Sequence, residues 1–188
     1  MMIASPDARS RAAVLIGYVR WLRANSYYEL VAKRVRPELR ALMEEPPIRT
    51  AWISGRDIED LMHALEQVST SAECRRLGVE VTRDSVLPTI RPIIEAALRR
   101  THASPATIYQ RLDVMMRMVV PDQSVTYRAI DQSSGEVVIG WPYTPHEATL
   151  EVWAGALEVA LELCGRTGEV RILAQPDARR ARFAVSWR

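Results

Sequence analysis

The stretch LEVWAGALEVALELCG, residues 150–165, decides the fold, because apolar residues cover most of the circumference of the helix that it predicts. At about 100° per residue, the acidic side chains of this helix fall within a sector of about 60°. They are Glu147, Glu151, Glu158 and Glu162. A surface helix needs an apolar stripe of little more than about 100°. The helix predicted over residues 145–164 is therefore covered on two sides.

The two apolar flanks of this helix differ in the size of their side chains. The side chains of one flank are small enough for another backbone to approach closely. This flank consists of Ala148, Val152, Gly155 and Val159. The other flank is bulky and consists of Leu150, Trp153, Leu157, Leu161 and Cys164. We expect one side of the helix to lie on a sheet and the other on the N-terminal helices, a partner chain or a ligand. A glycine in mid-helix costs about 1 kcal/mol relative to alanine, so we expect a second backbone against Gly155.

The sheet is predicted by a change of period from 3.6 to 2 after Pro121. Alternating residues at 125–130 are followed by the turn DQSSGE at 131–136 and the strand VVIGW at 137–141. After the helix come the strand VRILA at 170–174 and the strand RFAVSW at 182–187. In the last strand Phe183, Val185 and Trp187 share one face, which we expect to meet the helix.

Helical periodicity dominates the chain before Pro121. Ser5-Pro6-Asp7 predicts the first helix start, and Ser54 predicts the cap of the helix over 55–68. A second helix is expected from Ser26, and Pro37 either kinks it or starts a third helix over 37–45. Further helices are expected over 71–77 and 86–100, and from Ser104-Pro105 onward. The sequence thus predicts an α+β fold in one domain, residues 1–188. A helical layer (6–120) packs on an antiparallel four-stranded sheet whose subregion (121–188) has the order strand-strand-helix-strand-strand.

Composition and charge favour an ordinary soluble globular protein, since 48% of the residues are hydrophobic and 26% are charged. Charge is uneven: residues 9–40 carry eight basic and two acidic side chains, whereas 121–165 carry one basic and seven acidic ones. Such alternation docks subregions or protomers, or is plain surface charge. The segment YVRWLRANSYYELVAKRVR, residues 18–36, interleaves basic and aromatic residues, as nucleic-acid-binding proteins do. Its Tyr18 and Leu22 lie on a predicted core stripe, however, and the net charge of +2 also argues against a nucleic-acid partner.

Cys74 and Cys164 are isolated in the sequence, which indicates no disulfide framework and favours a reducing cytoplasm. No apolar run approaches the roughly 20 residues that span a bilayer, and we expect no membrane span.

No motif in the sequence carries chemistry. The histidines His63, His102 and His146 lie far apart, and none has a ligand partner at i, i+4 spacing. There is no GxSxG, P-loop or GxGxxG sequence, and no cysteine stands beside a predicted base and acid. We therefore predict that the protein is not an enzyme and has no catalytic residues, no metal and no cofactor.

The segment TPHEATLEVWAGALEVALELCGRTGEVRILAQPDARRARFAVSW, residues 144–187, resembles an uncharacterised family of myxobacterial paralogues. CRRLGVEVTRDSV, residues 74–86, resembles the mid-chain Leu-Gly segment of the same family. The order of elements is similar to the haem-nitric-oxide/oxygen-binding and 4-vinyl-reductase-like domains. This resemblance implies N-terminal helices on an antiparallel sheet, with a buried pocket between the layers in the sensors.

Haem sensors of that group use a helix histidine and a Tyr-x-Ser-x-Arg triad. His102 lies at a comparable point here, but residues 126–131 read TYRAID and the triad is absent. The absence of this triad argues against haem binding.

The leading hypothesis is a non-enzymatic sensory or interaction domain that binds a small apolar ligand or a protein partner between the helical layer and the sheet. The candidate surface comprises Met115, Met116, Leu150, Trp153, Gly155, Leu157 and Cys164. The over-wide apolar arc of the helix also predicts self-association, for instance as a dimer. The alternative of a different class is a ligand-free oligomeric scaffold or adaptor.

Overall fold

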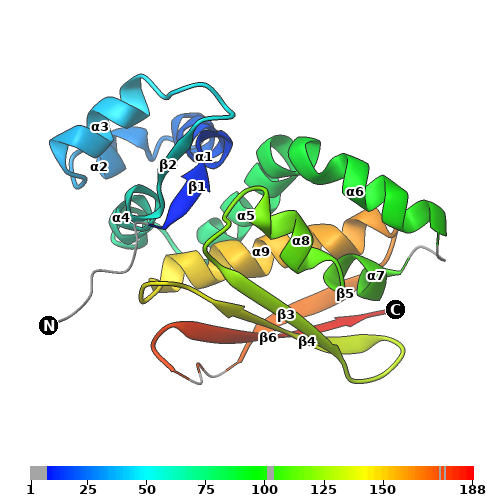
Figure 1. Cartoon of the computed structure of the whole chain (residues 1–188). Coiled ribbons are helices and arrows are strands. Elements are labelled where there is room, and N and C mark those ends of the chain that lie inside the picture. The colour runs from blue at the N-terminus through cyan, green and yellow to red at the C-terminus, as the bar shows by residue number, and fades with distance from the viewer. Residues whose placement is uncertain (1–7, 101–103, 174, 176) are drawn as a thin grey trace, which may run out of the picture.

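The C-terminal part of the chain forms an antiparallel sheet of four strands, and helices cover one face of this sheet (Figure 1). In this computed structural model the described residues are 8–100, 104–173, 175 and 177–188. The strands are β3 (Ser124–Ala129), β4 (Ser134–Gly140), β5 (Gly168–Ile172) and β6 (Arg180–Trp187). Their order in space is β3-β4-β6-β5, so the last strand of the chain lies inside the sheet. The predicted α+β fold with four antiparallel strands is confirmed.

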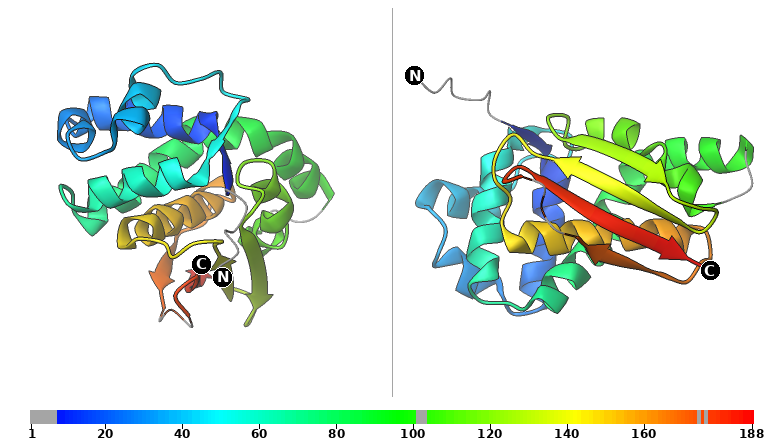
Figure 2. Two further views of the ribbon diagram at one scale, coloured as in Figure 1. Left: turned by 60° about the vertical axis from the view of Figure 1, so that its left-hand side comes forward. Right: turned by 90° about the horizontal axis from the view of Figure 1, so that it is seen from below.

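The phase of the sheet follows the period-2 pattern of the sequence. In β6 every second residue is buried, namely Ala181, Phe183, Val185 and Trp187. The expected face of the last strand is thus confirmed. The right-hand view of Figure 2 shows the sheet from its other side, which none of the described helices covers, with α9 (Glu147–Leu163) behind it.

Helix α9 lies between the sheet and α5 (Ser71–Val81), as its wide apolar arc predicted (Figure 1). The small-residue flank meets α5 through two glycines. A β-carbon added at Gly155 would overlap the Arg75 carbonyl oxygen, and one added at Gly78 would overlap the Val152 carbonyl oxygen. The predicted close approach at Gly155 is confirmed, and the neighbouring backbone belongs to the same chain.

Glutamates of α9 that form its narrow acidic sector also contact α5. Glu151 and Glu158 both pair with Arg75, at nitrogen–oxygen distances of 2.9 Å and 3.4 Å. The Arg75 guanidinium additionally donates to the Val170 carbonyl in β5. The crossing of α5 and α9 is therefore apolar at its centre and ion-paired at its edge.

Two short strands near the N-terminus were not predicted. β1 (Arg9–Arg11) pairs with β2 (Trp52–Ser54). Because β1 occupies these residues, the first described helix, α1, begins at Ala12. The helix start predicted at Ser5-Pro6-Asp7 lies outside the described part of the chain. The predicted cap at Ser54 is confirmed, since its hydroxyl accepts a hydrogen bond from the Arg56 amide at 3.2 Å.

The remaining helices differ from the predicted ones mainly in where one helix ends and the next begins. They are α1 (Ala12–Ala24), α2 (Tyr28–Ala32), α3 (Pro37–Glu44), α4 (Gly55–Glu66), α6 (Leu87–Arg100), α7 (Pro105–Tyr109) and α8 (Leu112–Arg117). The expected gap between residues 77 and 86 is absent, because the π-helical turn η1 (Thr82–Val86) joins α5 to α6. Gly78 reads as a helix end in the sequence, yet it is the residue that allows α5 to reach α9. The single helix expected after Ser104 is instead divided into α7 and α8.

One continuous hydrophobic core includes residues of the helical layer and of the sheet. The single domain over residues 1–188 stays a prediction. Among the described helices, none combines the length and the hydropathy that crossing a bilayer requires.

Candidate functional site: an apolar cavity and a histidine cluster

A cavity of about 110 Å³ lies among the helices, with α9 as one wall. Its lining residues come from α1, α4, α5, η1, α6, α7, α8 and α9, together with β1, Ala8 before it, and the loops that contain residues 119–123 and 143. The apolar wall includes Val14, Ile58, Met62, Val81, Val86, Ile90, Ile94, Ile108, Leu112, Val152 and Ala160. No described residue of β3, β4, β5 or β6 lines it. The expected position between helical layer and sheet is therefore wrong in one respect: α9 separates the cavity from the sheet.

The seven residues of the predicted surface fall into two groups. Met115, Met116, Trp153 and Leu157 line the cavity. The others, which are Leu150, Gly155 and Cys164, are not among its lining residues. Gly155 faces α5 instead, and Cys164 follows the end of α9.

One end of the cavity is polar. Its lining there includes Ser10 and Gln123, and within the described part of the chain the Ser10 hydroxyl and the Gln123 amide oxygen are buried without a hydrogen-bond partner. Leaving such an atom unpaired costs about 1–3 kcal/mol. Arg9 and Asp122 lie at the same end and pair with each other at 3.2 Å. Polar residues thus border the cavity at one end, and mostly apolar side chains border it elsewhere.

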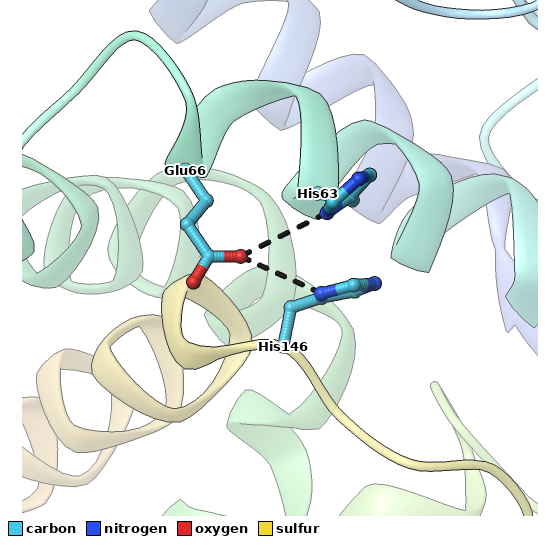
Figure 3. Close-up of side chains that lie close together, drawn as sticks. All are labelled: His63, Glu66 and His146. Atoms are coloured by element: carbon cyan, nitrogen blue, oxygen red, sulfur yellow. Dashed lines mark ion pairs between the residues drawn. The ribbon is translucent and has the colours of Figure 1, made fainter.

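Two histidines that the sequence placed far apart meet in the structure, which corrects the expectation that none has a partner (Figure 3). His63 lies on α4 and His146 immediately precedes α9, and their ring centroids are 4.3 Å apart. Glu66 approaches both: its Oε2 is 3.9 Å from Nδ1 of His63 and 3.4 Å from Nδ1 of His146. The signal that sequence reasoning missed is the i, i+3 pair His63–Glu66, which places both side chains on one helix face. His102 lies outside the described residues.

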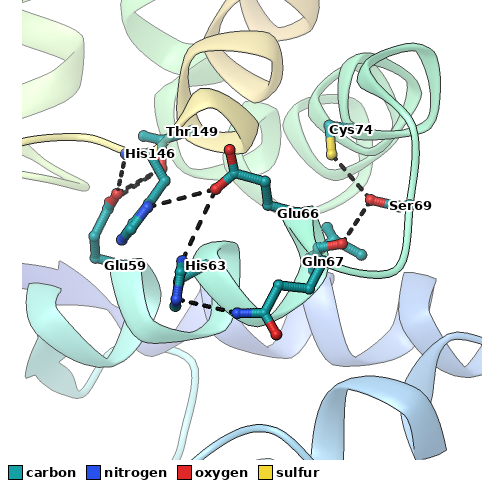
Figure 4. Close-up of polar contacts among 9 residues, drawn as sticks. Glu59, His63, Glu66, Gln67, Ser69, Cys74, His146 and Thr149 are labelled. Carbon is teal, nitrogen blue, oxygen red and sulfur yellow. Dashed lines mark hydrogen bonds and ion pairs between the residues drawn. The ribbon is translucent and has the colours of Figure 1, made fainter.

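A buried carboxylate, Glu59, lies beside the histidine cluster and contacts the backbone of His146 (Figure 4). Glu59 accepts a hydrogen bond from the His146 amide at 2.6 Å and another from the Thr149 hydroxyl at 3.0 Å. Burial raises the pKa of Glu59 to about 7, although these hydrogen bonds oppose that shift. Glu59 therefore fixes the start of α9 against α4.

Neither thiol is activated. Burial raises the pKa of Cys74 and the pKa of Cys164 above the ordinary value for cysteine. The arginines that follow Cys74 in sequence thus do not produce the lowered pKa that a nucleophilic thiol needs. These observations give no support to a cysteine-based enzyme.

The aromatic residues of the basic segment 18–36 pack on the protein itself. Trp21 is 4% exposed and stacks on Tyr27 at a centroid distance of 5.7 Å. A nucleic-acid base needs an exposed aromatic face on which to stack. Trp21 therefore packs within the protein and is not available to stack on a nucleic-acid base.

The haem that the family resemblance implies does not fit the described residues of the cavity. Iron in haem is held by histidine, by a thiolate, by tyrosinate, or by methionine together with histidine. The described lining has no histidine and no cysteine, and burial raises the pKa of its two phenols, Tyr18 and Tyr143, above the ordinary value. The one arginine in that lining, Arg9, is already paired with Asp122.

Comparison with known proteins gives matches in structure alone: no family model matches the sequence, and no curated protein does. An Fe(II) unliganded H-NOX protein from K. algicida has a TM-score of 0.69 and 11% identity, over 95% of this chain and 96% of that one. An oxygen-binding H-NOX domain related to soluble guanylate cyclases has a TM-score of 0.62 and 8% identity, over 95% of each chain. A doubly substituted variant of the Tt H-NOX has a TM-score of 0.64, again at 8% identity over 95% of each chain. The order of helices and strands along this chain therefore builds the fold that H-NOX proteins have.

Proposed function

We propose that this protein is a non-enzymatic sensory domain that binds a small, largely apolar molecule in the cavity beside α9. The observation that carries the proposal is the cavity itself, which has about 110 Å³ of space and a wall of aliphatic and methionine side chains. An engineered apolar cavity of about 150 Å³ stays dry and binds benzene. The fold is in keeping with a ligand-binding role, because the structurally similar proteins include one described as oxygen-binding.

The polar end of the cavity narrows the class of ligand. Ser10 and Gln123 offer a hydroxyl and an amide oxygen that no described residue engages. A ligand with one hydroxyl or carbonyl group would pair with one of them while its hydrocarbon part lies among the side chains of α6, α8 and α9. Pairing of that kind adds about 0.5–1.5 kcal/mol, which is about two- to tenfold in affinity.

Benzene and phenol are the probes that test this proposal. Each is expected to raise the melting temperature of the full chain saturably, since a ligand that binds only the folded state stabilises it by mass action. Phenol is expected to bind about two- to tenfold more tightly, and Ser10→Ala is expected to reduce that preference.

A cavity-filling variant supplies the control for these measurements. Ala160→Leu adds volume to the cavity wall and is expected to abolish both shifts, whereas Ala41→Leu, at an exposed position of α3, is expected to leave them unchanged. If Ala160→Leu does not fold, Ala156→Leu in the same wall takes its place. Absence of any saturable shift in the unmodified protein would contradict the proposal and favour the ligand-free scaffold.

The residues that line the cavity argue against the alternative that the protein is a haem-type sensor. Protein expressed with a haem precursor is expected to show no Soret band after purification, because the described lining supplies no iron ligand of the usual kinds. Ultraviolet–visible absorption measures this directly. A stoichiometric band that His102→Ala removes would overturn the expectation.

The structure removes the observation from which self-association was predicted. The apolar arc of α9 predicted a partner, but α5 and the sheet cover that arc within one chain. We keep the oligomeric scaffold or adaptor as the alternative function, and a cytoplasmic location as a prediction. Gel filtration with light scattering tests the oligomeric state.

A further inference from the structure

We propose that His63, Glu66 and His146 form a binding site for a divalent transition-metal ion of the zinc type, which links α4 to the start of α9. This inference is independent of the apolar cavity, because none of the three residues is among the cavity-lining residues. It rests on three side chains that converge from α4 and from the residue immediately before α9 (Figure 3).

The ligand atoms already have nearly the spacing that zinc requires. Zinc bonds of about 2.0–2.1 Å in a tetrahedron place neighbouring ligand atoms about 3.3 Å apart. Here Oε2 of Glu66 is 3.4 Å from Nδ1 of His146 and 3.9 Å from Nδ1 of His63. One ligand atom from each residue lies within 4.8 Å of the other two. The two rings are stacked at an interplanar angle of 29°, so both must turn out of this arrangement before their in-plane lone pairs can meet at one ion. The side chains of His63 and His146 are 54% and 36% exposed, which leaves room for that rotation.

The surroundings orient these ligands as outer residues orient the ligands of known metal sites. A metal-bound histidine usually gives its second ring N–H to an acceptor. Nε2 of His63 lies 3.1 Å from the Gln67 side-chain amide, whose oxygen takes this role when the amide is turned over (Figure 4). The backbone of His146 is fixed by its hydrogen bond to Glu59, which holds the ring near α4. The two histidine ligands are therefore each held by a separate neighbouring residue.

The donor set selects the class of ion. Two imidazole nitrogens and one carboxylate oxygen suit zinc, nickel or copper(II), whereas magnesium and calcium prefer oxygen alone. Three protein ligands leave a coordination position for water. Since the ligands come from α4 and from the residue immediately before α9, bound metal would stabilise the contact between these helices.

Zinc binding to the full chain, after removal of metal with a chelator and dialysis, tests the proposal. Isothermal titration is expected to give one zinc ion per chain, and zinc is expected to raise the melting temperature while magnesium does not. Cobalt(II) is expected to show the visible absorption of a tetrahedral site and to be displaced by zinc.

Variants separate a metal site from a merely structural hydrogen-bonded cluster. His63→Gln, Glu66→Gln and His146→Asn are each expected to weaken zinc binding at least about tenfold, as loss of even an outer-shell residue does. Asparagine at 146 suits the position before a helix, so α9 is expected to keep its start. His102→Gln and the exposed Glu44→Gln serve as matched controls and are expected to leave binding unchanged.

Two outcomes would overturn the proposal. One is the absence of stoichiometric zinc binding by the unmodified chain. The other is zinc binding that persists at equal affinity when His63 and His146 are both replaced. Melting temperatures measured without metal show whether each variant is folded, so a loss of binding is read only from folded protein.

Discussion

Trp187→Ala is expected to lower the free energy of unfolding by about 3–5 kcal/mol, as truncation of a buried aromatic side chain does. Trp187 is 9% exposed and lies on the helix-facing side of β6. Its ring packs beside Tyr109, with centroids 6.1 Å apart. The Tyr109 hydroxyl in turn donates to the Leu157 carbonyl of α9 at 2.9 Å, so Trp187 stands where α7, α9 and the sheet meet.

Urea denaturation followed by circular dichroism measures this loss, and Trp52→Ala is the matched control. Trp52 is 40% exposed and its main contact is the Arg11 guanidinium, 3.6 Å from the ring centroid. An exposed cation–π contact contributes about 0.5–1 kcal/mol, so the control variant is expected to lose no more than that. A loss below about 1 kcal/mol for Trp187→Ala would show that the phase of β6 is wrong.

Gly155→Ala is expected to lower the free energy of unfolding by about 2–3 kcal/mol, although alanine favours helix more than glycine does. The added methyl group would overlap the Arg75 carbonyl oxygen, which is backbone and moves only with α5. Gly78→Ala is expected to act similarly through the Val152 carbonyl. Since either variant separates the same two helices, the double variant is expected to lose less than the sum of the two.

Gly17→Ala is the control for this prediction. An added β-carbon there meets the side-chain atoms Ser85 Oγ at 2.6 Å and Val81 Cγ1 at 2.7 Å, and side chains can rotate away. The gain in helix propensity of about 1 kcal/mol offsets part of that contact, so the net loss is expected to be smaller than at Gly155. Because the neighbour of Gly155 lies in the same chain, the melting temperature is expected to be independent of protein concentration. A stabilised Gly155→Ala variant would contradict the close crossing of α5 and α9.

The two candidate sites show which of their residues could be predicted from the sequence pattern of a single helix or strand. Trp153 and Leu157 were found because a helix with an over-wide apolar arc must be covered on both sides, and Met115 and Met116 because they lie on the apolar stripe of the helix expected after Ser104. All four line the cavity. The polar end formed by Ser10 and Gln123 has no sequence signal, because the two residues are brought together by pairing of β1 with β2 and by the loop before β3. Similarly, His63 and His146 have no shared pattern, since their meeting depends on where α4 lies relative to α9.

The sequence by itself determined the period of each long element and therefore which faces are buried. The face of β6 that holds Phe183, the cap at Ser54 and the two covered sides of α9 all follow from side-chain spacing, which depends only on local backbone geometry. Tertiary structure decided the strand order β3-β4-β6-β5, the start of α1 after β1 and the continuous path from α5 into α6. These features depend on contacts between residues distant in sequence, such as Gly78 against Val152, and such contacts override local propensity because they bury backbone and side chains together.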